Sequence, residues 1–134
     1  VRNFLPMADI VKVSEEELSD ITGIREQTQA ARILLHGNTK AVFVTAGADG
    51  AAVYTGSAYA AMPSEKAVCV DATGAGDTFA GTILYQFLRD GLRDASTLTE
   101  DRMKEYLYYA NRAAAVTVSG RGAIPSMPFA GQIF

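Results

Sequence analysis

The sequence predicts an α/β protein in which a largely parallel sheet carries helices on both faces. Short apolar runs of strand length alternate along the chain with segments whose apolar residues recur at helical spacing. The run at residues 41–45 (AVFVT) is apolar throughout, as in strands that are covered on both faces. The loops between these segments are short, which favours strands and helices packed in layers. We therefore interpret residues 1–134 as one domain, long enough to bury a core.

The first predicted unit is a strand at residues 9–13 (DIVKV) followed by a short helix. Ser14 and Glu17 have the spacing of a capping box, in which each side chain accepts a hydrogen bond from the other residue's backbone N–H. Gly23 suits the position just after the last helical turn. These local signals explain all three residues without any ligand.

A second helix is predicted over Arg25–His36, with Ala30, Ile33 and Leu34 facing the core. Histidine suits the end of a helix, where it meets free carbonyl groups, and Gly37 follows it as expected after a last turn. We therefore interpret the only histidine as a helix cap rather than a catalytic base.

Three further strands follow, at residues 41–45, 51–55 and 59–62. The Asp-Gly pair within residues 47–50 is typical of a hairpin turn between the first two of them. A Pro-Ser pair ends the third strand, which we expect at an edge of the sheet.

The stretch VCVDATGAGDTFAG at residues 68–81 is predicted to run from a strand through a glycine turn into a helix. The strand is expected at Ala67–Val70, and Cys69 within it is expected to be a buried, inert thiol. The helix is expected over residues 75–89. Its apolar residues recur at helical spacing: Phe79, Ile83, Leu84, Phe87 and Leu88.

The last long helix is predicted to begin after Thr99 as its N-cap and to run to Val118, beyond a polar loop at residues 90–98. Glu100 and Asp101 in its first turn are favoured by the helix dipole. Its apolar stripe consists of Met103, Tyr106, Leu107, Ala110, Ala114 and Val118.

The glycine turn at Thr73–Asp77 has the chemistry of an anion site with a carboxylate beside it. Such a turn points backbone N–H groups at one spot, at the positive end of the helix dipole. Gly74 and Gly76 allow positive φ and a close approach of the anion. Asp77 would repel that anion, so we interpret it as a base that accepts a proton from the attacking group. The alternative is an acidic residue that the helix dipole alone favours.

Two familiar phosphate-binding motifs are excluded by this stretch. The dinucleotide-binding fingerprint G-x-G-x-x-G would need its third glycine earlier than Gly81, and the P-loop would need a lysine in the turn.

Composition argues against nucleic acid or a membrane as a partner. The formal net charge is −3, and no apolar run is long enough to span a bilayer. With one cysteine no internal disulfide can form, which favours a reducing compartment, and we expect a cytoplasmic location.

The segment VDATGAGDTFAG resembles the signature of the PfkB (ribokinase-like) family of sugar and nucleoside kinases. The resemblance implies a ribokinase-like α/β fold and phosphoryl transfer from ATP with Mg²⁺ to a primary hydroxyl. It also implies that Gly74, Ala75 and Gly76 form an anion hole, completed by the N–H of Asp77, and that Asp77 is the catalytic base.

Other segments extend this resemblance in the family's order. Thr45, Gly47 and Gly50 resemble a segment that leaves room for the ribose and phosphates of ATP, and Asn111 falls where an adenine-pocket residue is expected. Ser14-x-x-Glu17 stands where the family has Asn-x-x-Glu, whose Glu helps to organise Mg²⁺ through water.

The stretch Lys-Val-Ser-Glu-Glu-Glu resembles the fructokinase and 2-keto-3-deoxygluconate kinase branch of the family. Lys12 in it is interpreted either as facing the phosphates or as a solvated edge lysine.

The tail at residues 119–126 (SGRGAIPS) resembles the closing segment of the family, which in some members helps to surround a K⁺ ion. An ordinary glycine–proline loop is the alternative interpretation. The K⁺ ligands implied by the resemblance are Asp71, Thr73, Thr117, Gly122 and Ser126.

The function implied is ATP-dependent phosphorylation of a small sugar. Family members are about twice this length, so the resemblance implies the ATP-binding C-terminal portion of a kinase, without the N-terminal half and its lid. We expect the chain alone to turn over weakly, and to associate either with that half or with a second copy. The alternative hypothesis is a non-catalytic nucleotide-binding or assembly module that keeps the fold.

Overall fold

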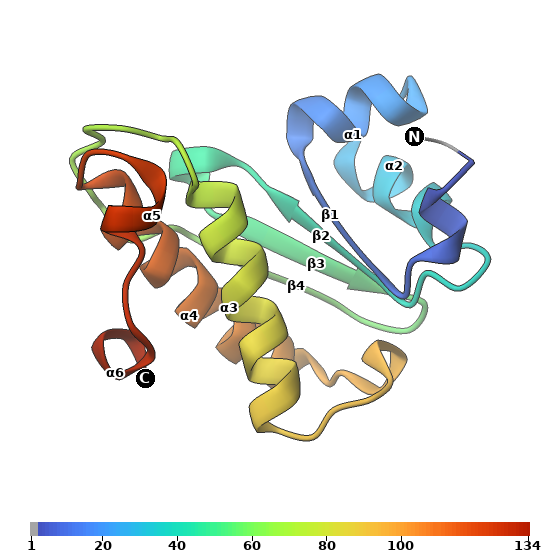
Figure 1. Ribbon diagram of the computed structural model, residues 1–134. Coiled ribbons are helices and arrows are strands. Elements are labelled where there is room, and N and C mark those ends of the chain that lie inside the picture. The colour runs from blue at the N-terminus through green and yellow to red at the C-terminus, as the bar shows by residue number, and fades with distance from the viewer. Residues whose placement is uncertain (1–2) are drawn as a thin grey trace.

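The computed structural model describes residues 3–134, which form a four-stranded sheet between two helical layers (Figure 1). The strands are β1 (Ile10–Ser14), β2 (Ala41–Thr45), β3 (Ala51–Thr55) and β4 (Tyr59–Met62). The helices are α1 (Glu15–Thr22), α2 (Gln27–Leu34), α3 (Ala75–Arg89), α4 (Glu100–Val118), α5 (Ala123–Ser126) and α6 (Ala130–Ile133). Short 3₁₀ turns occupy Leu5–Met7, Gly47–Asp49 and Ala95–Thr97.

The sheet has the order β1-β2-β3-β4 and is mixed rather than largely parallel. Only β1 and β2 run parallel, because α1 and α2 carry the chain back between them. The β2–β3 and β3–β4 pairs are antiparallel, since each is joined by a tight turn that reverses the chain. The expectation of an α/β fold with helices on both faces is confirmed, whereas the expected strand direction is wrong for these described strands.

The expected strand at Ala67–Val70 is also wrong, because these residues lie outside the sheet. The N–H groups of Val70 and Asp71 instead donate to the carbonyl oxygen of Val118, at 2.7 and 3.2 Å. Cys69 is exposed, contrary to the expectation of a buried thiol. An apolar run of this length forms a strand only where it pairs with one, and residues 67–70 pair with none of the four strands.

Local signals around α1 behave as the sequence predicts. The Ser14 side chain accepts from the N–H of Glu17 at 3.1 Å, and the Glu17 carboxylate accepts from the N–H of Ser14 at 2.7 Å. Gly23 ends the helix with φ of 75°, in the left-handed region. Helix α2 is shorter than expected, and Ile33 is exposed while Ala31 is buried in its place.

The only histidine, His36, lies just beyond α2. Its Nδ1 is 2.8 Å from the carbonyl oxygen of Ile33, so the ring binds the end of the helix as a cap.

The core is divided between the two faces of the sheet. Val11, Val13, Val42, Val44 and their neighbours pack against α1 and α2 on one face. The other face packs against α3 and α4, and its central contact is an edge-to-face pair of Phe43 and Phe79, with ring centroids 6.4 Å apart. On the outer side of α3, Leu84 and Leu88 are 53% and 81% exposed, so that part of the apolar stripe is not covered.

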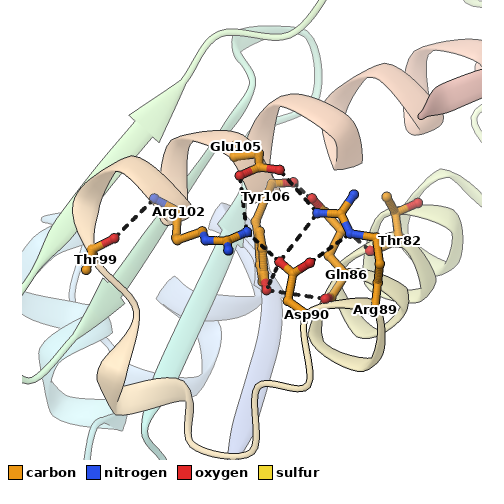
Figure 2. Close-up of polar contacts among 8 residues, drawn as sticks. All are labelled: Thr82, Gln86, Arg89, Asp90, Thr99, Arg102, Glu105 and Tyr106. Carbon is orange, nitrogen blue, oxygen red and sulfur yellow. Dashed lines mark hydrogen bonds and ion pairs between the residues drawn. The ribbon is translucent and has the colours of Figure 1, made fainter.

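A polar cluster joins the C-terminal end of α3 to α4 (Figure 2). The Asp90 carboxylate accepts from Arg89 Nε at 2.8 Å, Arg102 Nη1 at 2.7 Å and the hydroxyl of Tyr106 at 2.9 Å. Burial raises the pKa of Tyr106, so its hydroxyl stays protonated and donates. The buried Gln86 amide donates to the carbonyl oxygen of Tyr106 at 3.1 Å, which joins the two helices a second time.

Asp90→Asn is expected to lower the free energy of unfolding at pH 7 by about 1 kcal/mol, because a charge-assisted cluster with partly exposed arginines is lost. The hydrogen bond from Arg89 holds the pKa of Asp90 below its usual value. Its contribution is therefore present above the unfolded pKa of about 4 and disappears as the pH falls through the lower folded value. Urea unfolding of the wild type and the variant should show a difference that shrinks below about pH 4. If the free energies of unfolding of the two proteins still differed at pH 2, the difference would not come from the ionised Asp90 carboxylate.

Candidate functional site

The positive end of α3 is left open in this structure. Gly74 is the residue before the first turn, and no side chain caps the helix. The N–H of Ala75 donates to the carbonyl oxygen of Ala72 at 3.3 Å, whereas the N–H groups of Gly76 and Asp77 find no backbone acceptor within residues 3–134. Free N–H groups at a helix N-terminus attract anions. The turn therefore has the geometry of an anion cradle.

Gly74 is required here by both conformation and space. Its φ of 84° lies in the left-handed region, and a Cβ atom on it would be 2.6 Å from the Cβ of Ala123. Figure 1 shows α5, which contains Ala123, beside the start of α3. The turn and the tail are thus fitted against each other.

Asp77 stands in the first turn of α3 with its side chain exposed to solvent. It borders a groove of about 240 Å³ together with Gly81 and Met127. An exposed carboxylate beside free N–H groups can receive a proton from an incoming group. Deep apolar burial, which would have excluded that role, is not observed for Asp77.

A cavity of about 330 Å³ opens next to the turn. Its volume is within the range of small-molecule sites. Six of the candidate site residues from the sequence analysis border it: Thr45, Gly47, Gly50, Ala75, Gly76 and Asn111. Much of the remaining lining consists of the apolar residues Phe79, Ala114 and Val118 and of the rim residues Ser64, Ala67 and Cys69. The cavity is mainly apolar, and it adjoins the cradle at Ala75 and Gly76.

Gly47 and Gly50, the two glycines that follow β2, differ in their surroundings. A Cβ on Gly47 would meet no atom within 4 Å, so this position leaves open space beside the cavity. Gly50 has φ of 106°, and a side chain there would collide with the backbone of Met62 and Pro63. The close approach of β4 to the turn therefore explains Gly50 without a ligand.

Asn111 fixes one side of the cavity. Its Nδ2 atom donates to the carbonyl oxygens of Met62 at 3.1 Å and Pro63 at 3.2 Å, and the residue is buried. The amide therefore anchors the segment that leaves β4 and forms the cavity rim.

Cys69, Ser64 and Ala67 in that rim were not recognised as candidate site residues from the sequence. The signal available was their position directly before the glycine turn, but the expected strand would have placed Cys69 in the core. The absence of that strand makes the thiol a part of the cavity wall.

Lys12 extends from β1 to the other side of the glycine turn. A Cβ placed on Gly76 would lie 2.8 Å from Lys12 Nζ, so the ammonium group stands beside the middle of the cradle. It borders a separate, smaller cavity of about 120 Å³ between β1 and α3. This position agrees better with a lysine that faces the anion site than with a solvated lysine at the edge of the sheet.

Glu17 is engaged locally. Its carboxylate accepts from the N–H of Ser14, and its own N–H donates to the Ser14 side chain. Both hydrogen bonds belong to the capping box. No group of three or more His, Cys, Asp or Glu side chains suited to a metal ion occurs within residues 3–134.

The residues proposed around K⁺ are only partly brought together. The Asp71 carboxylate accepts from the N–H groups of Thr73 at 2.9 Å and Gly122 at 3.0 Å, which ties the turn to the tail. Hydrogen bonds from Thr73 and Gly122 hold the pKa of Asp71 below its usual value. Ser126 donates to the carbonyl oxygen of Arg121 at 3.0 Å, nearby in the tail.

Thr117 meets the tail through its backbone, since its carbonyl oxygen accepts from the N–H of Gly120 at 3.3 Å. Its hydroxyl is buried between α3 and α4, 3.0 Å from the hydroxyl of Thr78, and donates to the carbonyl oxygen of Ala113. Its side chain therefore serves helix packing.

Among the described residues, no helix is both long and apolar enough to cross a membrane.

Comparison with known proteins gives a consistent result. Residues 1–130 match the model of the pfkB family carbohydrate kinases. Fructokinase-1 from Zea mays is 38% identical over 127 residues, which are 94% of this chain and 38% of the maize protein. Fructokinase with bound ATP from Xylella fastidiosa aligns with a TM-score of 0.85 at 28% identity, over 96% of this chain and 42% of that one.

A further solved structure is the fructokinase from Vibrio cholerae O395 in its fructose, ADP and calcium ion bound form. It aligns with a TM-score of 0.80 at 30% identity, over 98% of this chain and 41% of that one. This chain thus spans 38–42% of the length of these relatives.

Proposed function

This chain belongs to the pfkB family of carbohydrate kinases, and from that premise we propose that it supplies the nucleotide site, anion hole and catalytic base of an ATP-dependent sugar kinase. The proposed reaction transfers a phosphoryl group from ATP to a primary hydroxyl of a small sugar. Fructose is the preferred candidate, because the maize and Vibrio cholerae relatives are fructokinases.

One observation carries the proposal. The uncapped N-terminus of α3 has free N–H groups on Gly76 and Asp77, and it adjoins a mainly apolar cavity that Gly76 borders. An aromatic base and ribose suit the apolar part, whereas a phosphate chain suits the N–H groups. The exposed Asp77 stands at the same turn, where an attacking hydroxyl would have to arrive.

In the proposed mechanism Asp77 accepts the proton of the sugar hydroxyl as its oxygen attacks the terminal phosphorus of ATP. The bond between that phosphorus and the bridging oxygen of ADP breaks, and ADP leaves with the electron pair. The N–H groups of Gly76 and Asp77, with Ala75 where its bond to Ala72 opens, stabilise the negative charge on the transferred group.

We propose that Mg²⁺ binds at this site together with the phosphates of the nucleotide. A bound Mg²⁺ neutralises phosphate charge in phosphoryl transfer, and we propose that Glu17 reaches it through water after its capping bond to Ser14 rearranges. We propose Asp71, Thr73, Gly122 and Ser126 for K⁺, although both Asp71 oxygens already accept N–H groups.

We further propose that turnover requires the remainder of a kinase fold, since this chain spans 38–42% of its relatives. Without groups that orient the sugar, no sugar hydroxyl is held between the Asp77 carboxylate and the terminal phosphate of ATP. The exposed Leu84 and Leu88 on α3 support an association with another polypeptide or a second copy through that face. Sedimentation of the chain alone distinguishes a monomer from a self-associated form.

ATP is expected to protect Cys69 from alkylation, because the thiol borders the proposed nucleotide cavity. At a nucleotide concentration ten times the Kd, about a tenth of the chains are free, so labelling should slow about tenfold. Cys69 is the only cysteine, so the loss of reactive thiol reports this position alone.

Fructose without nucleotide serves as the control and should give no protection. Equal labelling rates at saturating ATP and without it would refute nucleotide binding in this cavity. Protection without phosphorylation, in an assay of the catalytically complete protein with sugars, would instead favour the non-catalytic binding module.

A further inference from the structure

We infer that Ile133 and Phe134, which we call the α6 anchor, hold the tail against the glycine turn and so keep the cradle in the shape that binds the phosphates of the nucleotide. They are positioning residues, because they act through Met127 and α5 rather than on the nucleotide itself. The inference rests on the proposed function, since it requires a phosphate chain at the N-terminus of α3.

The first step is the lack of burial along residues 118–132, all of which the structure describes. None of these residues is buried, and Ile124 in α5 is 81% exposed. Helix α5 has only four residues, and a helix of that length is not stable in isolation. The position of α5 must therefore be fixed by contacts that the chain makes on either side of it.

The second step is the attachment at the two ends of this stretch. At its start the N–H of Gly122 donates to the Asp71 carboxylate at 3.0 Å, which ties the chain to the residues before the glycine turn. At its far end Ile133 is 4% exposed and is the first buried residue after Thr117. The α6 anchor thus supplies the apolar attachment that the tail itself lacks.

Phe134 makes this attachment specific, because side chains of both α3 and α4 contact its ring. The ring centroid of Phe134 is 4.9 Å from that of Tyr85 and 4.7 Å from that of Tyr109. The guanidinium carbon of Arg89 is 5.2 Å from the Phe134 ring centroid, within the range of a cation–π contact. Tyr85 and Arg89 belong to α3, so the anchor binds the same helix whose N-terminus forms the cradle.

The third step is the contact between the anchored chain and the turn. Met127 Cε would be 3.4 Å from a Cβ on Gly74, and the Cβ of Ala123 would be closer still, at 2.6 Å. Met127 and the α6 anchor also line the groove of about 240 Å³ that Asp77 borders. The chain that the anchor fixes is therefore the chain that covers the turn.

The turn needs such external support. Glycine adopts many backbone conformations, and Gly74 is held here at a left-handed φ of 84°, with no side chain capping α3. Contacts from Met127 and Ala123 restrict this freedom before a phosphate arrives, so the N–H groups are already in place when it binds. Residues 119–134 do not border the 330 Å³ cavity, where the base and ribose are proposed to bind. Release of the anchor should therefore affect the phosphates and not the nucleoside.

Titration of Phe134→Ala and Phe129→Ala with ATP and with adenosine tests the assignment. Adenosine has the base and ribose of ATP but no phosphates. Phe129 lies in the same stretch and is 83% exposed, so its truncation removes the same atoms and leaves the anchor intact. We expect Phe134→Ala to weaken ATP binding about tenfold, as if a tenth of the molecules kept the anchored chain, and to leave adenosine binding within about twofold. Phe129→Ala should change neither affinity.

A merely structural role of Phe134 gives a different result. Partial unfolding would lower the apparent affinities for ATP and adenosine by the same factor, because both would bind only the folded fraction. Phe134→Tyr keeps the ring and should bind ATP within about twofold of the wild type. Circular dichroism confirms that each variant is folded. If Phe134→Ala does not fold, Phe134→Leu, which keeps apolar bulk without the ring, takes its place in the same comparison.

Hydrogen exchange in the wild-type chain supplies a test that needs no variant. Coupling between two sites is reciprocal, so ATP should favour the anchored state by the same factor by which anchoring favours ATP. The N–H of Phe134 donates to the carbonyl oxygen of Ala130 at 3.0 Å and reports on α6. We expect it to exchange up to about tenfold more slowly with saturating ATP than without, and adenosine to leave its exchange unchanged.

Three results would overturn the inference while leaving the proposed function intact. They are a folded Phe134→Ala variant that binds ATP as tightly as the wild type, one that loses ATP and adenosine affinity equally, and exchange in α6 that bound ATP does not slow. A wild-type chain that binds neither ATP nor adenosine would overturn the proposed function and this inference together.

Discussion

Asp77→Asn is expected to lower the rate of phosphoryl transfer to fructose by about 10²–10⁴-fold, the usual contribution of a general base. Asparagine has nearly the same shape but accepts no proton at neutral pH, so the attacking hydroxyl would keep its proton. ATP affinity should be unchanged or slightly higher, because a negative charge beside the phosphates is removed. The measurement is steady-state turnover in the catalytically complete protein, with ATP binding determined separately.

Asp20→Asn is the matched control for this variant. Asp20 is exposed near the end of α1 and lies in none of the cavities that border the glycine turn. The same change of charge there should leave turnover within about twofold, as for surface substitutions in general. Near-normal turnover by Asp77→Asn would remove Asp77 from the mechanism.

Gly74→Ala is expected to destabilise the protein by at least about 1–2 kcal/mol and to abolish detectable ATP binding at the turn. The left-handed φ of 84° costs an alanine roughly that amount. In addition, its Cβ would be 2.6 Å from the Cβ of Ala123 and 3.0 Å from the Cα of that residue, so the turn or α5 must shift. A shift of the turn moves the N–H groups that we propose to hold the phosphate. Urea unfolding and ATP titration measure the two effects separately.

Gly81→Ala provides the control within the same helix. Gly81 has no positive φ, and a Cβ there would meet no atom within 4 Å. Alanine at an exposed helix position should therefore stabilise the protein by up to about 1 kcal/mol. If Gly74→Ala were as stable as the wild type, the fit between the turn and α5 would not be required for folding.

Several features of the fold follow from residues that are close in the sequence, and these could be predicted. The capping box of Ser14 and Glu17, the end of α1 at Gly23 and the N-cap of α4 at Thr99 each depend on neighbours within one helical turn. The buried residues Met103, Tyr106, Leu107 and Ala110 of α4 follow from its 3.6-residue period. Towards its C-terminal end, Ala113, Ala115 and Thr117 are buried, whereas the expected Ala114 and Val118 are only half-buried.

Other features depend on distant partners, and these could not be predicted. Strand direction in the sheet is set by which connections reverse the chain, and residues 67–70 find no neighbouring strand. Their backbone is instead bound at Val118, far along the chain. Exposure of Leu84 and Leu88 likewise depends on what covers the outer side of α3, which periodicity alone does not reveal.

For the candidate site, the sequence singled out residues that the structure brings to one cavity, among them Thr45, Gly47, Gly76 and Asn111. The reason was the resemblance of their segments to those of the PfkB family, in the family's order. It could not indicate that Gly50 serves the approach of β4, nor decide between the two interpretations of Lys12, whose Nζ lies beside Gly76. Both facts depend on how β1, β4 and α3 meet in space.

The cavity rim has a mechanical property that follows from its two attachments. The segment between Pro63 and Val70 is held at its start by Asn111 and at its end by Val118, and both belong to α4. Between these two hinges it contributes no strand to the sheet. We therefore expect the amide hydrogens of this segment to exchange with solvent sooner than those of the four strands, because local opening here leaves the core folded.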